Sequence, residues 1–514
     1  MMRQRLLKSI ERAFVFVLAL SAVFAVSRKF PDTMIEPKWL AAVLSVAAWG
    51  TFHCACRFLG RRKEENEGIL PVVESSMVIV CGLQATFFLL QEVGAVSFYG
   101  QFTAGSFGNV AGFASCICLS FPLGWRQART CGQPWRMLFL LSKALCVVAV
   151  VWSGSRTGLL CLLACSVWKA LPVMRKPLLC GMPLLLLLFV FGFKTDSSRG
   201  RWFILQRSCE LIAQRPLTGW GSGGFEAHYM DVQADYFKSC PDSEYALLAD
   251  NIRHPLNEWL AVTADYGLVG LAVVLLLVVT VVRYALRHPS PMSASVLQVW
   301  LCLGIFSLFS YPFHYPFTWL VMVWGLAVVF RQLLSRWRKS ACLVLLVLLP
   351  VVGTLTVCRA KQEMALRQLQ DKVSYGQAKR MLPRYAQLYP HRRHDFRFLY
   401  SYAFCQYEAG RYPDALRTAR ECRSLLTDYD LMLLLGDTFS ALGQQDSTLY
   451  YYGRAHGMCP SRLTPLYEQF CVYRSAGDSV RCRQLQRAIL SKPVKVKSRA
   501  VEEMTEEVRS YGEK

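Results

Sequence analysis

The chain has 514 residues, of which 54% are hydrophobic and 18% are charged, whereas a soluble domain is usually about 45–50% apolar and about 25% charged. The apolar residues lie in runs that reach the roughly 20 residues a membrane-spanning helix requires, and so many runs in succession exclude a soluble core. The net charge of +23 would indicate nucleic-acid binding in a soluble protein, but here short basic clusters alternate with the apolar runs, so we interpret them as membrane topology and expect no nucleic-acid partner.

The first twelve residues are basic and precede an apolar run at 14–26. This start is similar to a signal peptide, but further apolar runs follow at once, so we predict an uncleaved first span. Apolar length and the charges between the runs predict about eleven helical spans. They are expected at 13–28, 39–58, 70–91, 108–124, 137–153, 158–173, 178–193, 260–282, 294–313, 316–330 and 340–358.

Lysine and arginine predict the orientation of these spans, because cytoplasmic loops carry an excess of both. Three basic residues conflict with the pattern because they fall in a loop assigned to the outside: Arg28, Lys29 and Lys38. The basic clusters of the other loops all agree with one orientation, so we keep that orientation. The N-terminus is therefore expected in the cytoplasm, with the segment 194–259 and everything after residue 359 outside. The basic clusters that agree lie near 3–12, 57–63, 126–136, 169–176, 283–287 and 331–339.

Two parts of the chain lie outside in this topology and are more than connectors. The segment 194–259 is too long and too polar for a simple loop, and long ordered loops are usually functional. The tail is polar, helical in pattern and free of long apolar runs. We therefore predict a membrane domain at 1–358 and a helical tail domain at 359–514.

The tail shows a weak internal repeat. Ala415, Thr448 and Cys482 occupy corresponding small-residue positions, 33 and 34 residues apart. This period predicts tetratricopeptide-like helix pairs stacked into a solenoid. The middle unit fits best, with the expected glycine, aromatic, aromatic, small residue and proline at Gly436, Phe439, Tyr452, Ala455 and Pro460.

The 20 cysteines indicate no zinc site, because no two CxxC pairs occur at suitable spacing. Most lie inside apolar runs, where cysteine acts as a small hydrophobic residue. Cys209 and Cys240 fall in the outer segment, where pairing is one possible state.

The fragment SGSRTG places Arg156 at the outer end of the fifth span. A charge there is costly unless it meets water, a partner or an anionic ligand. One interpretation is a guanidinium that binds phosphate through its planar fork. The other is an arginine whose long side chain reaches the lipid headgroups, and the residues alone do not decide between them.

The outer segment begins with a basic helix and a glycine-rich turn. Arg199 and Arg201 stand together near the membrane surface, and apolar residues at helical spacing follow them. The fragment RPLTGWGSGGF, which starts at Arg215, then requires an irregular turn. Such a turn can present backbone N–H groups to an anion, or it can simply reverse the chain.

The fragment RHPLNEWL brings His254, Asn257 and Glu258 directly before the eighth predicted span. Histidine is the side chain best suited to accept a proton near neutral pH. His314, in YPFHYPF, lies in another outer loop and is the rival candidate. Arginines and a candidate base at one membrane surface suit a lipid-linked diphosphate substrate.

Four fragments in succession resemble signatures of the O-antigen ligase and polymerase family. They are GSFGNVAGFAS, SGSRTG, GRWFILQRSCELIAQRPLTGWGSGGF and HPLNEWLAVTADYGLVGL, and the resemblance covers roughly residues 70–330. Their order and the large outer segment before the last spans also match. One departure stands out: many members read His-x-His-Asn where this chain reads His254-Pro255-Leu256-Asn257.

The resemblance implies a GT-C-like, metal-independent, cofactor-free transferase in the bacterial inner membrane. Such enzymes move a glycan from undecaprenyl diphosphate to an acceptor at the periplasmic face, most often a lipid A–core sugar. The implied base is His254, and the implied diphosphate ligands are Arg156 and Arg201, with Arg199 and Arg215 as second choices. Asn257 or Glu258 would orient the imidazole or bind sugar, and the tail would be periplasmic.

Several alternatives stay open at this point. Within the family, a polymerase adds repeats to a lipid-linked glycan, and a protein O-oligosaccharyltransferase uses serine or threonine as the acceptor. A transporter of lipid-linked sugars would also need basic residues, but it would more often show internal repeat symmetry and broken helices. A membrane-anchored scaffold would act through the tail, whose repeat type mostly binds proteins.

Overall fold

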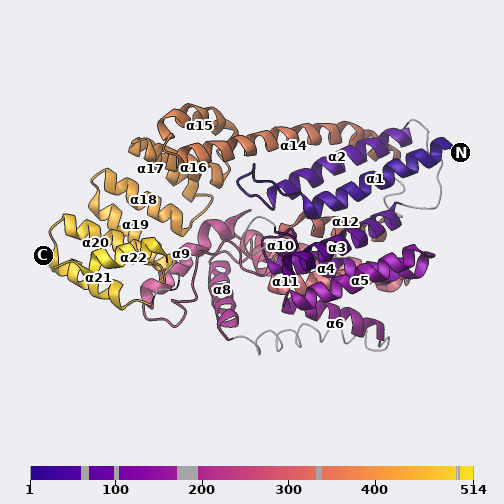
Figure 1. Ribbon diagram of the computed structural model, residues 1–514, viewed down its shortest axis with the longest axis horizontal. Coiled ribbons are helices and arrows are strands. Elements are labelled where there is room, and N and C mark those ends of the chain that lie inside the picture. The colour runs from indigo at the N-terminus through magenta and orange to yellow at the C-terminus, as the bar shows by residue number, and fades with distance from the viewer. Residues whose placement is uncertain are drawn as a thin grey trace. The chain divides into compact units, whose positions relative to one another are not determined.

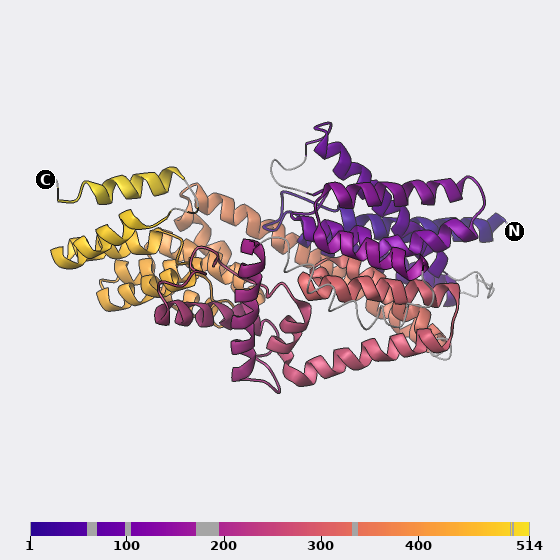
Figure 2. The ribbon, with the colours of Figure 1, turned by 90° about the horizontal axis from the view of Figure 1, so that it is seen from below.

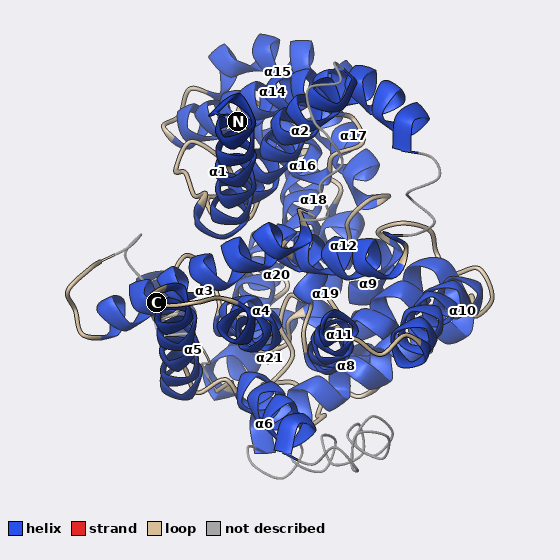
Figure 3. Cartoon of the chain, turned by 90° about the vertical axis from the view of Figure 1, so that its right-hand side faces the viewer, coloured by secondary structure: helices blue, strands red, loops and turns tan. Residues whose placement is uncertain are grey.

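The computed structural model describes residues 2–58, 69–97, 104–170, 195–331, 338–493, 495 and 498–512. Within these ranges every regular element is a helix, apart from one isolated bridge between Ala104 and Phe107 (Figure 3). The predicted all-α class is confirmed for this part of the chain. The span expected at 178–193 lies outside the described residues.

The chain folds as two compact units, each made from separate stretches of sequence. The first comprises Met1–Val190, Leu256–Glu258 and Val274–Arg367. The second comprises Phe191–Pro255, Trp259–Val273 and Gln368–Lys514, so the outer segment folds together with the tail. These units reflect compactness, whereas the domains predicted at 1–358 and 359–514 reflect membrane topology.

The first unit is a bundle of mostly apolar helices (Figure 1). Its core is formed mainly by α1, α3, α4, α5, α6, α11 and α12, whose buried side chains belong to one continuous apolar cluster. The elements of this unit are α1 (Met2–Phe24), α2 (Glu36–Phe58), α3 (Leu70–Glu92), α4 (Val110–Thr130), α5 (Trp135–Trp152), α6 (Arg156–Ala170), the second part of α10 (Glu258–Arg287), α11 (Pro291–Phe309), η2 (Pro312–His314), α12 (Pro316–Val329) and most of α14 (Arg338–Ser374).

Ten of the eleven predicted spans coincide with a helix in the described residues. Six of these helices, α2, α3, α5, α10, α11 and α14, are long and apolar enough to cross a membrane. Large apolar side chains on two of them are exposed in the protein, such as Leu276 on α10 (67%) and Val347 on α14 (64%). Such surfaces suit contact with lipid, and the chain is a multi-pass membrane protein, although the number eleven stays a prediction.

The conflict that Lys38 posed for the orientation has a structural explanation. Lys38 lies at the start of α2 but is only 1% exposed. Its ammonium donates to the carbonyl oxygens of Ser106 (2.7 Å) and Met34 (3.0 Å). A buried lysine that binds backbone carbonyls is not a solvated loop charge, so counting it with the loops was misleading.

The second unit joins the outer segment to the tail helices. In the tail each helix packs on the next one along the chain, which is the neighbour pattern of a helical stack (Figures 1 and 2). The elements of this unit are α8 (Thr195–Gln214), α9 (Gly224–Ser239), the first part of α10, the end of α14, α15 (Ala378–Arg392), α16 (Phe396–Glu408), α17 (Tyr412–Arg423), α18 (Tyr429–Ala441), α19 (Gln445–Met458), α20 (Thr464–Ser475), α21 (Ser479–Ser491) and α22 (Arg499–Arg509).

The repeat positions expected in the tail are packing positions. Ala415, Thr448 and Cys482 are each at most 1% exposed. A side chain at Gly436 on α18 would collide with the ring of Tyr452 on α19, so glycine permits the close approach of this pair. The helix pairs are therefore present, while their assignment to the tetratricopeptide type stays a prediction.

Candidate functional site

Arg156 is the first residue of α6. The chain leaves α5 and reverses at Gly154, whose φ of +64° is left-handed. The Ser155 hydroxyl then accepts a hydrogen bond from Gly158 N (3.1 Å), as in a capped helix N-terminus. The partial positive charge of a helix N-terminus attracts anions, and here it adds to a guanidinium. This placement favours the phosphate-binding interpretation of Arg156.

Arg199 and Arg201 lie two residues apart in the first turns of α8. Arg199 forms an ion pair with Glu244, which lies in the loop between α9 and α10. Its charge is thus partly compensated by a carboxylate of the same unit. The roles of Arg199 and Arg201 in binding diphosphate stay predictions.

The glycine-rich turn binds a carboxylate group of the chain itself. Asp265, on α10, accepts hydrogen bonds from Gly223 N and Phe225 N (both 3.0 Å). These N–H groups open α9, so Asp265 acts as a capping carboxylate contributed from a distant element. The same turn also pairs with α10 through Gly221 N and the Asp265 carbonyl (2.8 Å). The N–H groups that Asp265 binds are already satisfied, so the chain-reversal interpretation explains this turn.

Helix α10 is interrupted where the turn packs against it, which the apolar pattern at 260–282 did not indicate. Gly267 has φ 66° and ψ −167°, a conformation that is essentially restricted to glycine. A side chain there would collide with the carbonyl of Leu217. The freed backbone groups are used, because Leu268 N donates to Pro216 O (2.8 Å).

We predict that Gly267→Ala separates the turn from α10. Strained backbone alone costs about 1–3 kcal/mol, and the collision with Leu217 adds to this. Limited proteolysis of the purified protein should show faster cleavage between α8 and α10. Gly304→Ala is the control, because Gly304 lies within helix α11 and an added side chain meets nothing within 4 Å. Equal cleavage of the two variants would contradict the role given to Gly267.

Arg215, just past the end of α8, belongs to a stack of side chains. Its guanidinium lies 4.2 Å from the centroid of the Trp220 ring, and the ring of His228, on α9, lies 4.1 Å from the Trp220 ring between centroids. Burial lowers the pKa of His228 below its ordinary value, so the ring tends to be neutral. Arg215 thus has an aromatic partner, and its role as a second-choice diphosphate ligand stays a prediction.

His254 lies in the loop between α9 and α10, directly after a residue that is bound to the tail. Arg253 Nη2 lies 2.6 Å from Asp428 Oδ2, and Asp428 also caps α18 by accepting from Leu431 N (2.9 Å). Two residues after His254, Leu256 has φ +55°, the one left-handed non-glycine residue in the described part of the chain. Such strain costs about 1–3 kcal/mol and is common at functional sites.

Asn257 and Glu258 are held by the corner between α11 and α12. Asn257 Nδ2 donates to Leu308 O (3.1 Å), and Glu258 Oε1 accepts from Phe313 N (3.0 Å). The rival His314 is the next residue along the chain from Phe313. Both side chains therefore contribute to fixing the segment that follows His254, and an orienting role is consistent with these contacts.

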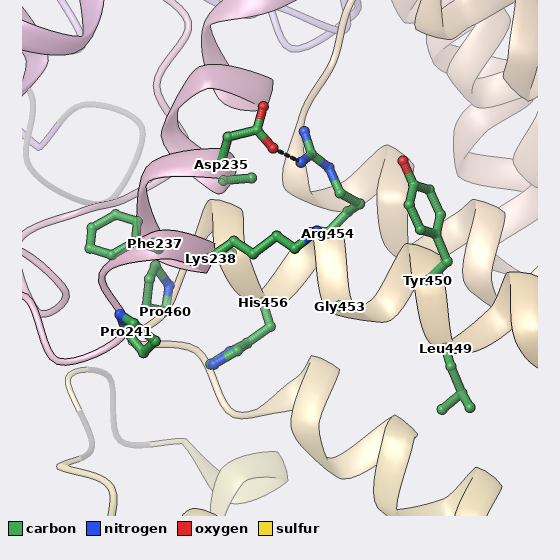
Figure 4. A pocket seen from close by; sticks show the side chains of 12 residues that line it. Asp235, Phe237, Lys238, Pro241, Leu449, Tyr450, Gly453, Arg454, His456 and Pro460 are labelled. Atoms are coloured by element: carbon green, nitrogen blue, oxygen red, sulfur yellow. Dashed lines mark hydrogen bonds and ion pairs between the residues drawn. The ribbon is translucent and has the colours of Figure 1, made fainter.

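The outer segment is docked onto the tail over several further contacts within the second unit. Gln233 on α9 donates to Met458 O (2.6 Å) on α19 and to Asp250 O (3.0 Å). Arg454 on α19 forms an ion pair with Asp235 on α9 (Figure 4) and a second one with Asp231 on the same helix. Ion pairs and buried amide contacts of this kind fix the position of the loop that carries His254.

The predicted site residues are divided between the two units. Arg156, Asn257 and Glu258 belong to the first unit, and Arg199, Arg201, Arg215 and His254 belong to the second. Their convergence around one substrate stays a prediction. Cys209 and Cys240 are both exposed free cysteines, so the structure does not pair them.

Sequence reasoning missed Arg253, Asp265 and Asp428. Each acts through a partner at least 40 residues away, which no local pattern reveals. One usable signal existed for Asp428, since an aspartate directly before a helical pattern is typical of a capping residue.

Comparison with known proteins gives one match. Residues 141–275 match the model of a protein family described as O-antigen ligase. No curated protein and no solved structure matches the chain. The matched stretch contains every site residue predicted from the sequence: Arg156, Arg199, Arg201, Arg215, His254, Asn257 and Glu258.

Proposed function

We propose that the chain transfers a glycan from undecaprenyl diphosphate to the hydroxyl of an acceptor, a lipid A–core sugar, because residues 141–275 match the model of the O-antigen ligase family. The family match and the apolar helices support a membrane glycosyltransferase of the O-antigen ligase or polymerase type. The observation that carries the proposal of glycan transfer to lipid A–core is that all seven candidate site residues lie inside the matched stretch.

In the proposed mechanism Arg156 and Arg201 bind the diphosphate of the donor. Diphosphate is already a good leaving group, so the main requirement is to stabilise the negative charge that grows on it as the glycosidic bond breaks. A guanidinium forms paired, charge-assisted hydrogen bonds with phosphate oxygens. The capped N-terminus of α6 at Arg156 supports this role because it attracts the same charge.

His254 would act as the general base in this mechanism. Its imidazole would accept the proton of the acceptor hydroxyl as the hydroxyl oxygen attacks the anomeric carbon. The attack would displace undecaprenyl diphosphate and invert the configuration at that carbon. The fixed residues on both sides of His254 support the assignment, since a base must be held within hydrogen-bond reach of its proton. Asn257 and Glu258 would keep the following segment in place.

The proposed setting is the periplasmic face of the bacterial inner membrane. The basic clusters of the loops favour a cytoplasmic N-terminus and a periplasmic tail. The substrates would then be a membrane-embedded lipid donor and a glycan acceptor, both reached from the periplasmic side.

The glycans of a deletion strain test the proposal. We expect polymer of normal length to accumulate on undecaprenyl diphosphate, while the lipid A–core stays uncapped, because chain growth does not need the ligase. Gel analysis of surface polysaccharide and mass spectrometry of lipid-linked glycans would measure both. Single repeats on the surface would instead indicate a polymerase, and loss of protein glycans with normal polysaccharide would indicate a protein glycosyltransferase.

A further inference from the structure

A cavity lies between α9 of the outer segment and α19 of the tail, both in the second unit (Figure 4). Its volume is about 600 Å³. Pockets of about 300–1,000 Å³ typically hold a small organic ligand and combine apolar walls with a few polar groups. We call it the α9–α19 cavity, and its lining has this mixed character.

Two buried polar atoms that belong to residues lining the cavity have no hydrogen-bond partner in the described structure. They are Arg454 Nε and His456 Nδ1. The terminal nitrogens of Arg454 donate to Asp231 and Asp235, while its Nε–H has no partner among the described residues. Burying a polar group without a partner is unfavourable, so such atoms call for a ligand or a bound water.

His456 can serve as the complementary group. Burial is the main cause that lowers its pKa to about 3, so the imidazole is neutral at physiological pH. A neutral imidazole has one nitrogen that accepts and one that donates. Arg454 and His456 together therefore suit hydroxyl groups, which donate and accept at once.

Aromatic and apolar surfaces complete the lining. Tyr450 is 55% exposed although it is a large aromatic residue, while Phe237 is buried and forms part of the wall. A tyrosine ring offers an apolar face and a polar tip. The ammonium of the exposed Lys238 adds a donor on the α9 side.

A pyranose sugar has the matching chemistry, with apolar C–H faces and a rim of hydroxyls. We propose that the α9–α19 cavity binds an oligosaccharide, with Tyr450 against a sugar face and with Arg454 and His456 hydrogen-bonded to hydroxyls. The proposal rests on the proposed function, because glycan is then the material that both substrates carry. The bound sugar is either part of the donor glycan or part of the acceptor, and both present the same groups.

Gly453 provides a probe that leaves the protein fold intact. It lines the cavity within α19, and an added side-chain carbon there meets nothing within 4 Å. Gly453→Trp should therefore fill the cavity with its indole ring, while Gly453→Ala is the matched control that adds one methyl group. Alanine and tryptophan are both better helix formers than glycine, so neither change should unfold α19.

Calorimetric titration of full-length protein in nanodiscs tests the proposal with defined probes. One probe is the oligosaccharide released by mild acid from the lipid-linked donor, another is the core oligosaccharide released from lipid A, and a linear glucan is the control. We expect one of the first two to bind wild-type and Gly453→Ala protein. Gly453→Trp should weaken that binding at least tenfold, and Tyr450→Ala should weaken it by a similar factor.

The outcome separates the two sources and the two proposals. Binding of the donor-derived probe assigns the cavity to the donor glycan, and binding of the core probe assigns it to the acceptor. The proposal is overturned if wild-type protein binds neither the donor-derived nor the core probe more tightly than it binds the glucan. It is also overturned if the Gly453→Trp and Gly453→Ala variants bind the probe equally. Calorimetry needs no turnover, so this result is independent of the deletion-strain phenotype that tests the transferase function.

Discussion

Replacing His254 by alanine is expected to lower glycan transfer by about 10²–10⁴-fold, the usual contribution of a general base. The protein should still insert and fold, because the segment around His254 is held by Arg253 on one side and by Asn257 on the other. The rate would be measured with purified protein, lipid-linked donor and rough lipopolysaccharide as the acceptor. A drop in kcat at an unchanged KM would fit a group that acts in the transition state.

His314→Ala is the matched control for this experiment. His314 is the other outer-loop histidine singled out from the sequence, and it lies in η2 next to Phe313, which Glu258 binds. We expect the His314 variant to keep most of its transfer activity. The opposite pattern, with full activity in the His254 variant and loss in the His314 variant, would move the base to His314.

Removing the tail by truncation after residue 367 is expected to abolish transfer, even where the protein still inserts. The truncated chain would lose the partners of Gln233, Arg253 and the two aspartates of α9, because these partners are Met458, Asp428 and Arg454. The loop that carries His254 would then lose the tail surface against which it folds. Transfer assays on inserted protein, with proteolysis of the outer segment, would measure both effects. Normal transfer by this truncated form would show that the tail is an accessory module.

A single substitution isolates one of these contacts. Asp428→Asn keeps a side-chain oxygen that can cap α18, but it removes the negative charge that pairs with Arg253. The matched control is Asp478→Asn, which makes the same change at the cap of α21. There the carboxylate forms an ion pair with Arg481 of the helix that it caps. Transfer should fall in the first variant and stay near the wild-type level in the second.

The amino-acid sequence was sufficient to predict the helices because apolar length is a local property. Ten expected spans coincide with helices, and the small residues expected in the tail, such as Ala415, are buried. Counting charges was less reliable, since Lys38 is a basic residue that the fold buries. The glycine turn at 219–224 was predicted as irregular, but nothing local indicated that Asp265 would fill it.

The sequence also did not predict that the outer segment docks onto the tail, because the residues that pair there are far apart along the chain. Gln233 and Met458 are 225 positions apart, and Arg253 and Asp428 are 175 positions apart. Pairings over such separations depend on shape and charge that only the folded surfaces present. Sequence patterns placed the site residues along the chain, and they did not show which surface holds them.

The discontinuous make-up of the second unit has a consequence for biogenesis. The stretch Phe191–Pro255 is synthesised long before Gln368–Lys514, with membrane helices inserted in between. Chains grow at about 5–20 residues per second, so the outer segment waits roughly 13–52 s until its partner surface is complete. Its maturation is therefore post-translational, and a premature stop late in the gene would yield an inserted protein whose outer segment stays exposed to proteases and chaperones.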